Sequence, residues 1–355
     1  MLPYFINIAI FLAYSPLFIY LNKKNKLFSE LYYIIIIIQL TFLLSFRYVT
    51  VGNDTGAYVQ AYLNQVPNDS LFGLLRRIVW ILSGGNYSAF LFVLSFVTIL
   101  CFVQALRVNS NELSKNFWGI LTFLMFFYIE CFNIERQMMA TSIAFLAVSL
   151  WINRHDRILP ILLFGIAFGI HNVTVCLLIA IVVWKLRNSK KIYLLLILLA
   201  IPFVMFSSVI FGFFAKFNGH YEMYANNIYG AYQNAGGVII FGLFFFVISV
   251  LCILITDICQ ESKANFYLGL VFLGSIISIV GYSSYIVTRI GEMFICFIIF
   301  IISDILNKFS EKIRPYQIFY VIAQILFFLI GILYLYTRLK KGHEGVVQYV
   351  FFWNA

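Results

Sequence analysis

Three arginines stand at the ends of long apolar runs, where a charged side chain is costly. Arg47 follows one run, and Arg136 and Arg289 stand at the start of two others. A charge near the centre of a bilayer costs at least about 2.5–3.5 kcal/mol, and such residues usually serve a function. A guanidinium binds two phosphate oxygens at once and stays charged when it loses water. These arginines are therefore candidate ligands for a polyanion. The alternative is pairing with a nearby acid, Glu135 beside Arg136 or Glu292 three residues after Arg289.

Asp54, His171 and two tyrosines are the other polar residues that could do chemistry. Asp54 lies in the turn signature Gly52–Thr55. Its carboxylate could act as an acid or base or accept a bond from a sugar hydroxyl; alternatively, it caps the helix that follows. His171 could transfer a proton near neutral pH, or it could serve packing alone. Tyr58 and Tyr62 lie four residues apart, where they could stack on sugar rings or belong to an interfacial aromatic belt.

The elements that must position these residues are membrane helices. The chain has 355 residues, of which 63% are hydrophobic and only 11% are charged, against roughly 25% charged residues in soluble domains. Its apolar runs are continuous, unlike the alternating segments of about ten residues that form a transmembrane barrel. The sequence therefore predicts an all-α polytopic integral membrane protein that forms one domain over residues 1–355.

We expect about twelve apolar segments along the chain. They lie near residues 2–21, 31–46, 87–106, 117–133, 137–152, 158–170, 172–184, 192–214, 237–256, 266–287, 290–307 and 316–336. The segments on either side of His171–Asn172 are each too short to cross a hydrocarbon core of about 30 Å. A break into two short helices, or a re-entrant hairpin, is therefore expected with His171 at its apex.

The basic residues predict the orientation of the chain. Lys23, Lys24 and Lys26 place the first turn in the cytoplasm, and alternation of the segments keeps most other basic residues on that side. Two larger loops, residues 47–86 and 215–236, then fall on the outer side together with both chain ends. The candidate chemical residues lie at this outer face.

The first outer loop contains the pattern of an interfacial helix. Apolar residues recur there at helical spacing, as expected for a helix that lies in the plane of the membrane surface. They are Leu71, Leu74, Leu75, Ile78 and Ile81. Arg76 and Arg77 of the same stretch could contact lipid headgroups.

Nucleic-acid binding and metal binding are not indicated. The positive-inside rule accounts for the net charge of +10. The six cysteines lie in or beside apolar runs and show no CxxC spacing, so neither a zinc site nor a disulfide framework is predicted. No acidic cluster of metal-ligand type stands in the outer loops.

Five short segments stand in order along most of the chain. They read FRYVTVGNDTGAY, NIERQMMATSIAFLAVSLW, FGIAFGIHNVTVCLL, YSSYIVTRIGEMF and VVQYVFF. These segments resemble motifs of the EpsG-like family of bacterial polysaccharide polymerases, although the last one lacks the proline expected beside its tyrosine. The positions that match the family motifs are Arg47, Gly52, Asp54, Tyr58, Arg136, Gln137, His171 and Arg289.

The resemblance implies a Wzy-type glycosyltransferase with a GT-C-like helical bundle and no metal or other cofactor. Such enzymes join O-antigen, capsule or exopolysaccharide repeat units carried on undecaprenyl diphosphate, at the outer face of the bacterial inner membrane. The expected partners are these lipid-linked oligosaccharides, membrane lipids and a chain-length regulator, and no nucleic acid.

For the reaction that the resemblance implies, we expect the following roles. The expected diphosphate ligands are Arg47, Arg136 and Arg289. Tyr58 and Gln137 are expected to contact the sugar. The expected general base is Asp54 or His171, with Glu135 as the third candidate.

Two other functions remain open. A flippase or transporter of lipid-linked oligosaccharides would also bind a lipid-borne polyanion, but it should show internal repeats with broken helices in matching positions. Only the break at His171–Asn172 is evident. A polysaccharide ligase would need the same arginines, and the sequence does not separate it from a polymerase.

Overall fold

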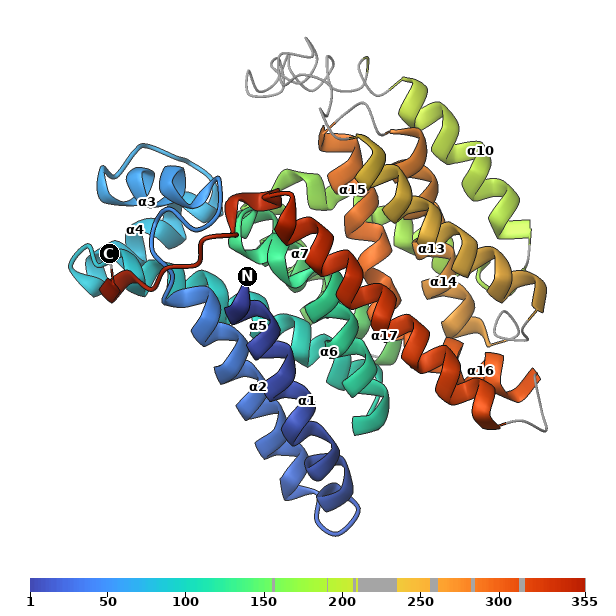
Figure 1. Ribbon diagram of the computed structural model, residues 1–355. Coiled ribbons are helices and arrows are strands. Elements are labelled where there is room, and N and C mark those ends of the chain that lie inside the picture. The colour runs from blue at the N-terminus through green and yellow to red at the C-terminus, as the bar shows by residue number, and fades with distance from the viewer. Residues whose placement is uncertain are drawn as a thin grey trace. The chain divides into compact units, whose positions relative to one another are not determined.

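The computed structural model describes residues 1–154, 157–189, 191–206, 209, 235–255, 261–281, 285–312 and 317–354. Within this part of the chain, helices are joined by turns and by one isolated antiparallel bridge between Arg47 and Phe351 (Figure 1). Contacts divide the chain into two compact units, Met1–Val175 with Ala323–Ala355, and Cys176–Ile322. The prediction of an all-α polytopic membrane protein is confirmed.

The first unit contains most of the predicted site residues. Its helices are α1 (Leu2–Asn22), α2 (Leu27–Ser45), α3 (Thr55–Leu63), α4 (Leu71–Ser83), α5 (Tyr87–Asn109), α6 (Leu113–Phe126), α7 (Glu135–Asn153) and α8 (Ile158–Ile170), with the short 3-10 helix η1 (Tyr128–Phe132) before α7. The part of α17 (Gln317–Lys340) from Ala323 onward and the C-terminal segment complete it. α5 packs along both α2 and α7, and α7 packs along α8.

The second unit is arranged around α14 (Ser262–Val280). This helix packs against α13 (Ala235–Ile255), α15 (Tyr285–Ile295) and α10 (Lys191–Met205). The unit also holds α9 (Ile179–Leu186), the 3-10 helix η5 (Cys296–Phe300) and α16 (Ile302–Lys312). Most residues of α14 are buried, as expected for a central apolar helix.

The sequence sets the ends of the helices near the candidate site. The Ser70 side chain caps α4 by accepting from the Gly73 N–H, and Gly84 ends α4 in the left-handed conformation at φ 63°. The Asn86 side chain caps α5 by accepting from the Ser88 N–H at 2.9 Å. α8 stops at Ile170 because His171 adopts an extended backbone, and the 3-10 helix η2 (Asn172–Leu178) follows. The predicted helix break at His171 is therefore present.

The number of full membrane spans is lower than the number of predicted apolar segments, which was about twelve. In the described residues, six helices are long and apolar enough to cross a membrane, or seven if the bent pair Val287–Phe300 and Ile302–Lys308 forms one span. Each described apolar segment is helical, but α6, α8 and α10 have only 14, 13 and 15 residues. α7 opens on Glu-Arg-Gln, which lowers its hydropathy. Apolar runs thus predicted helices, several of which are too short to cross a membrane.

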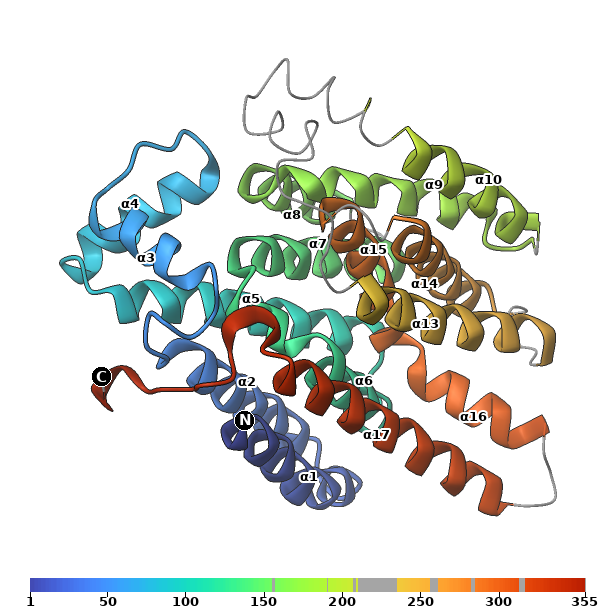
Figure 2. The ribbon, with the colours of Figure 1, turned by 45° about the horizontal axis from the view of Figure 1, so that its top comes forward.

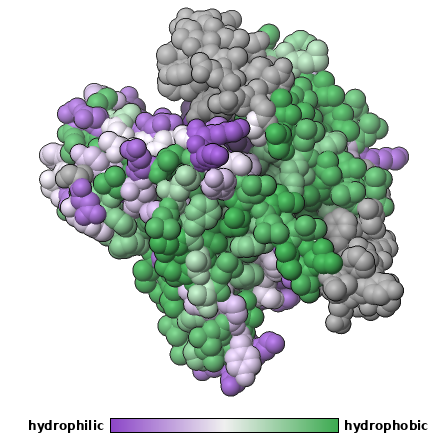
Figure 3. All heavy atoms as spheres, viewed as in Figure 1, coloured by the Kyte–Doolittle hydropathy of each residue, from purple (hydrophilic) through white to green (hydrophobic). Residues whose placement is uncertain are grey.

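Unit 1 has two polar ends separated by an apolar surface. The turn between α1 and α2 carries exposed lysines at one end, and α3 and α4 lie at the other end with the start of α5 (Figures 1 and 2). Hydrophobic side chains cover the surface between these ends in the view of Figure 3. α2, with 19 residues, spans about 28 Å between them, close to the thickness of a hydrocarbon core. The first predicted outer loop thus forms two helices, whereas residues 215–234 of the second lie outside the described residues.

Candidate functional site

The C-terminal segment binds along the loop that follows α2. The Tyr48 N–H donates to the Val350 carbonyl at 2.8 Å, and the Gly52 N–H donates to the Gly345 carbonyl at 3.1 Å. The N-terminus joins the same region, because the Met1 ammonium donates to the Val347 carbonyl at 3.0 Å. Both chain ends therefore lie at the end of unit 1 that carries α3 and α4 (Figure 2).

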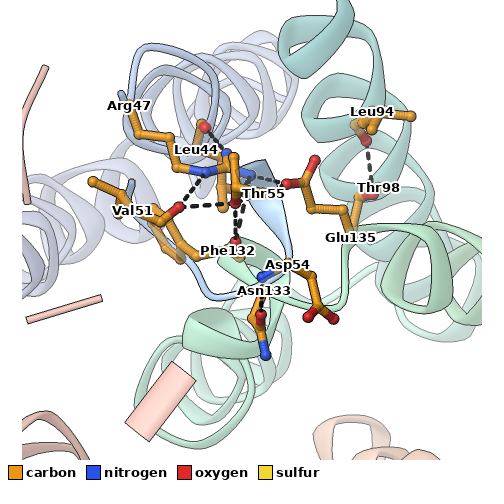
Figure 4. Close-up of polar contacts among 10 residues, drawn as sticks. All are labelled: Leu44, Arg47, Val51, Asp54, Thr55, Leu94, Thr98, Phe132, Asn133 and Glu135. Carbon is orange, nitrogen blue, oxygen red and sulfur yellow. Dashed lines mark hydrogen bonds and ion pairs between the residues drawn. The ribbon is translucent and has the colours of Figure 1, made fainter. Parts of the chain in front are cut away.

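Arg47 is buried inside this loop rather than presented at its surface. Its side chain is 0% exposed. The guanidinium donates to the Leu44 and Val51 carbonyls, to Thr55 Oγ1 and to the Phe132 carbonyl, and it forms an ion pair with Glu135 (Figure 4). A buried guanidinium is stable only when its donors are satisfied in this way. Arg47 thus ties the end of α2 to the starts of α3 and α7.

Glu135 supplies the counter-charge for Arg47. One carboxylate oxygen pairs with Arg47 and accepts from Thr55 Oγ1 at 3.2 Å, while the other is buried without a hydrogen-bond partner in the described structure. Glu135 therefore does not pair with its neighbour Arg136. The physical reason is that adjacent residues of a helix point about 100° apart.

Asp54 lies at the start of α3, and Asn133 holds its backbone. The Asp54 N–H donates to Asn133 Oδ1 at 2.8 Å, and its half-buried side chain makes no capping bond to α3. In Figure 4 the Asp54 carboxylate points away from the Arg47 guanidinium. The Asp54 carboxylate therefore does not cap α3, which was one of the two roles that the sequence predicted for it.

A polar network fixes Asn133 in turn. Its amide Nδ2 donates to one oxygen of Glu344, and Arg338 Nη2 donates to the other Glu344 oxygen at 2.9 Å. Arg338 also forms an ion pair with Glu130 of η1. Glu344 adopts φ 63°, which is rare for a residue with a side chain. The C-terminal segment therefore holds the residue that positions the Asp54 backbone.

Arg136 lies in the first turn of α7 and joins three helices. Its Nε donates to the Ile170 carbonyl at the end of α8 at 2.6 Å. Its guanidinium carbon lies 5.2 Å from the centroid of the Phe72 ring in α4. The Tyr58 ring of α3 packs edge-on against the same phenylalanine, with ring centroids 5.9 Å apart. Arg136 and Tyr58 thus both contact Phe72.

His171 follows the carbonyl that Arg136 binds. Its Nδ1 accepts from the Val173 N–H at 3.3 Å, and its carbonyl accepts from Thr174 Oγ1 at 2.9 Å. With Nδ1 as the acceptor, a neutral ring carries its proton on Nε2. The first bond orients the imidazole and the second holds the His171 backbone, one residue from the Arg136 contact.

Two predicted site residues have different settings. Gln137 is buried within α7. Arg289 lies on α15 in the second unit, one turn before Glu292. The prediction that Arg289 binds the same diphosphate as the arginines of unit 1 stays a prediction.

A comparison with family models assigns the chain to a family over most of its length. The model of the EpsG family matches residues 30–351. The chain belongs to the EpsG family. This is a family of proteins similar to Wzy-type polysaccharide polymerases. No curated protein and no solved structure matches the chain.

Sequence reasoning missed three residues of this EpsG-family site. Asn133, Arg338 and Glu344 form the network that supports Asp54, but Arg338 lies 208 positions from its partner Glu130. The available signal was Glu130 itself, an acid at membrane depth without a basic neighbour. Across the described residues, no group of three or more histidine, cysteine or acidic side chains is arranged to hold a metal.

Proposed function

We propose that this EpsG-family chain polymerises oligosaccharide repeat units that are linked to undecaprenyl diphosphate. The reaction would take place at the outer face of the bacterial inner membrane. The end of unit 1 that carries α3 and α4 would face outward, and the exposed lysines of the α1–α2 turn would face the cytoplasm. Their placement at opposite ends of α2 supports this orientation.

One observation carries the proposal. Arg136 contacts both the α8 end, next to His171, and the Phe72 ring, which also packs on Tyr58. Asp54 lies one helical turn before Tyr58. A cation, an imidazole, a carboxylate and an aromatic ring thus gather at one end of an apolar helical unit. This is the set of groups that a lipid diphosphate and a sugar hydroxyl require.

The reaction moves the growing chain from its carrier to a new repeat unit. The acceptor hydroxyl oxygen forms a bond to the anomeric carbon of the donor sugar, and the bond from that carbon to the diphosphate oxygen breaks. The electron pair leaves with undecaprenyl diphosphate, and the hydroxyl proton passes to Asp54 or His171. A positioned base contributes about 10²–10⁴ in rate.

The proposal gives Arg136 the leaving diphosphate. Negative charge develops on that group as the bond breaks, and loss of one fixed donor in such a site costs about 10²–10³ in rate. Arg289 is proposed as a second diphosphate ligand. Tyr58 is proposed to contact the sugar, and Gln137 to support the Arg136 turn.

Arg47 and Glu135 receive a positioning role instead of direct contact with substrate. Arg47 is fully buried, and Glu135 neutralises it. Opening this pair to reach a ligand would leave two buried charges unpaired, which is strongly unfavourable. In the proposal they hold the turn that presents Asp54.

The test is reconstitution of the purified full chain with synthetic undecaprenyl-diphosphate-linked repeat units. We expect a ladder of lengthening products and one undecaprenyl diphosphate released for each new linkage. Movement of the substrate across the bilayer without joining would indicate a flippase. Transfer only to an acceptor other than a repeat unit would indicate a ligase. Either result would overturn the proposal.

A further inference from the structure

α4 has an exposed apolar face, and its buried side carries one arginine. Ile81 and Leu82 are 72% and 81% exposed, and Leu71, Leu74 and Ile78 are exposed on the same helix. Such a face fits the boundary between headgroups and acyl chains. On the inner side, Phe72 and Arg76 are buried one turn apart. The sequence allowed Arg76 to contact lipid headgroups, and the structure shows that the residue is buried on this inner side.

Arg76 is an incompletely satisfied guanidinium. Arg76 is only 3% exposed. Nη2 donates to the Val66 carbonyl, and Nε is buried without an acceptor. No carboxylate among the described residues forms an ion pair with it. A buried charge in this state lacks the partner that would compensate its desolvation.

The charged groups that act on Arg76 are both positive. Arg77 follows directly, and Arg136 lies over Phe72, the residue one turn before Arg76 on the same face of α4. Burial, and then the charges of Arg77 and Arg136, lower the pKa of Arg76. Like charges repel, and an anion bound between them offsets this repulsion. Phosphate oxygens match guanidinium donors in both charge and geometry.

We infer that Arg76, together with Arg136 and Arg77, forms a binding site for the phosphate group of a lipid held beside α4. The inference deepens the proposed function and rests on it only in naming the polyprenyl carrier as one source of that phosphate. The other source is an anionic membrane phospholipid. In both cases the apolar face of α4 lies against the acyl region while Arg76 reaches the headgroup from the protein side.

The experiment measures lipid binding by the purified full chain. The variants are Arg76→Ala, Arg76→Lys and Arg77→Ala. Arg107→Ala serves as the matched control. Arg107 lies in the last turn of α5, away from α4, and pairs with Glu30 of α2. The probes are labelled undecaprenyl diphosphate, its displacement by inorganic pyrophosphate, and retention of phosphatidylglycerol in native mass spectrometry.

We expect Arg76→Ala to weaken binding of one of these lipids at least tenfold, and Arg107→Ala to leave it within twofold. Loss of undecaprenyl diphosphate binding, with displacement by pyrophosphate in the wild type, identifies the carrier as the source. Loss of phosphatidylglycerol retention alone identifies the phospholipid. Unchanged affinity for all probes overturns the site.

A folding defect is separated from a binding defect by the milder variants. If Arg76→Ala does not fold, Arg76→Lys and Arg77→Ala are each expected to weaken binding at least threefold, and wild-type affinity in both overturns the site. A wild-type chain that binds the carrier but joins no repeat units would refute the proposed function and leave this site standing. Polymerisation by the wild type, with unchanged lipid binding in the Arg76 variants, would support the proposed function and refute this site.

Discussion

The guanidinium of Arg47 and the carboxylate of Glu135 form an ion pair between side chains that are 0% and 3% exposed and lie 88 positions apart in the sequence. The pair joins the end of α2 to the start of α7. Because Thr55 also hydrogen-bonds to it, the pair fixes the turn from which Asp54 emerges. The pair is therefore a structural support for this end of unit 1.

Replacement of Arg47 by Ala is expected to lower the free energy of unfolding by about 3–5 kcal/mol, because it leaves Glu135 as an uncompensated buried charge. The measurement is thermal unfolding of the purified chain in detergent. Arg107→Ala is the control, since it breaks a partly exposed pair with Glu30 and should cost about 0–1 kcal/mol. Equal melting temperatures for the two variants would contradict the structural role of Arg47.

Gly345→Ala is expected to lower the free energy of unfolding by about 2–4 kcal/mol. Gly345 has φ 68°, and a Cβ there would overlap the side chain of Asn53. Gly84→Ala is the matched control, because Gly84 has φ 63° but open space around it, and should cost about 1 kcal/mol. A melting temperature for Gly345→Ala no lower than that of Gly84→Ala would show that the C-terminal segment is not held against the loop.

The sequence predicted the helices of this chain better than the contacts between them. Apolar runs identify helices because lipid requires every backbone group to be satisfied within the segment. The break at His171 was visible because each flanking run is too short to cross a bilayer. Pairing is different: the partner of Glu135 proved to be distant Arg47 instead of adjacent Arg136. Nor does any local spacing link Glu130 to Arg338, or Asn133 to Glu344.

Arg136→Ala is expected to slow polymerisation about 10²–10³-fold, because it removes a fixed donor from the leaving diphosphate. Arg136→Lys should recover part of this loss, since lysine keeps the charge but not the guanidinium fork. The rate of undecaprenyl diphosphate release measures both variants. Arg289→Ala tests the second proposed ligand in the same assay. Near-normal release in Arg136→Ala would remove Arg136 from the diphosphate site.

Asp54→Asn and His171→Gln distinguish the two candidate bases. The true base should lose about 10²–10⁴ in turnover while the variant still binds the lipid-linked acceptor, because only proton transfer is removed. The other variant should stay within tenfold of the wild type. Turnover and acceptor binding are measured on the same reconstituted samples. Wild-type turnover in both variants would exclude both residues as the base.

His343 is expected to make stability depend on pH. Burial and the positive charges of Arg338 and Lys341 lower its pKa below 6.5 in the folded chain, although Glu344 acts in the opposite direction. Between the folded value and 6.5 the unfolded chain binds more protons, so the contribution is fully present above 6.5 and is lost as the pH falls through this window. The melting temperature of the wild type should therefore fall more between pH 7.5 and pH 5.5 than that of His343→Gln. Parallel losses in the two proteins would mean that His343 stays neutral or charged in both states across this range, and that other groups set the acid sensitivity.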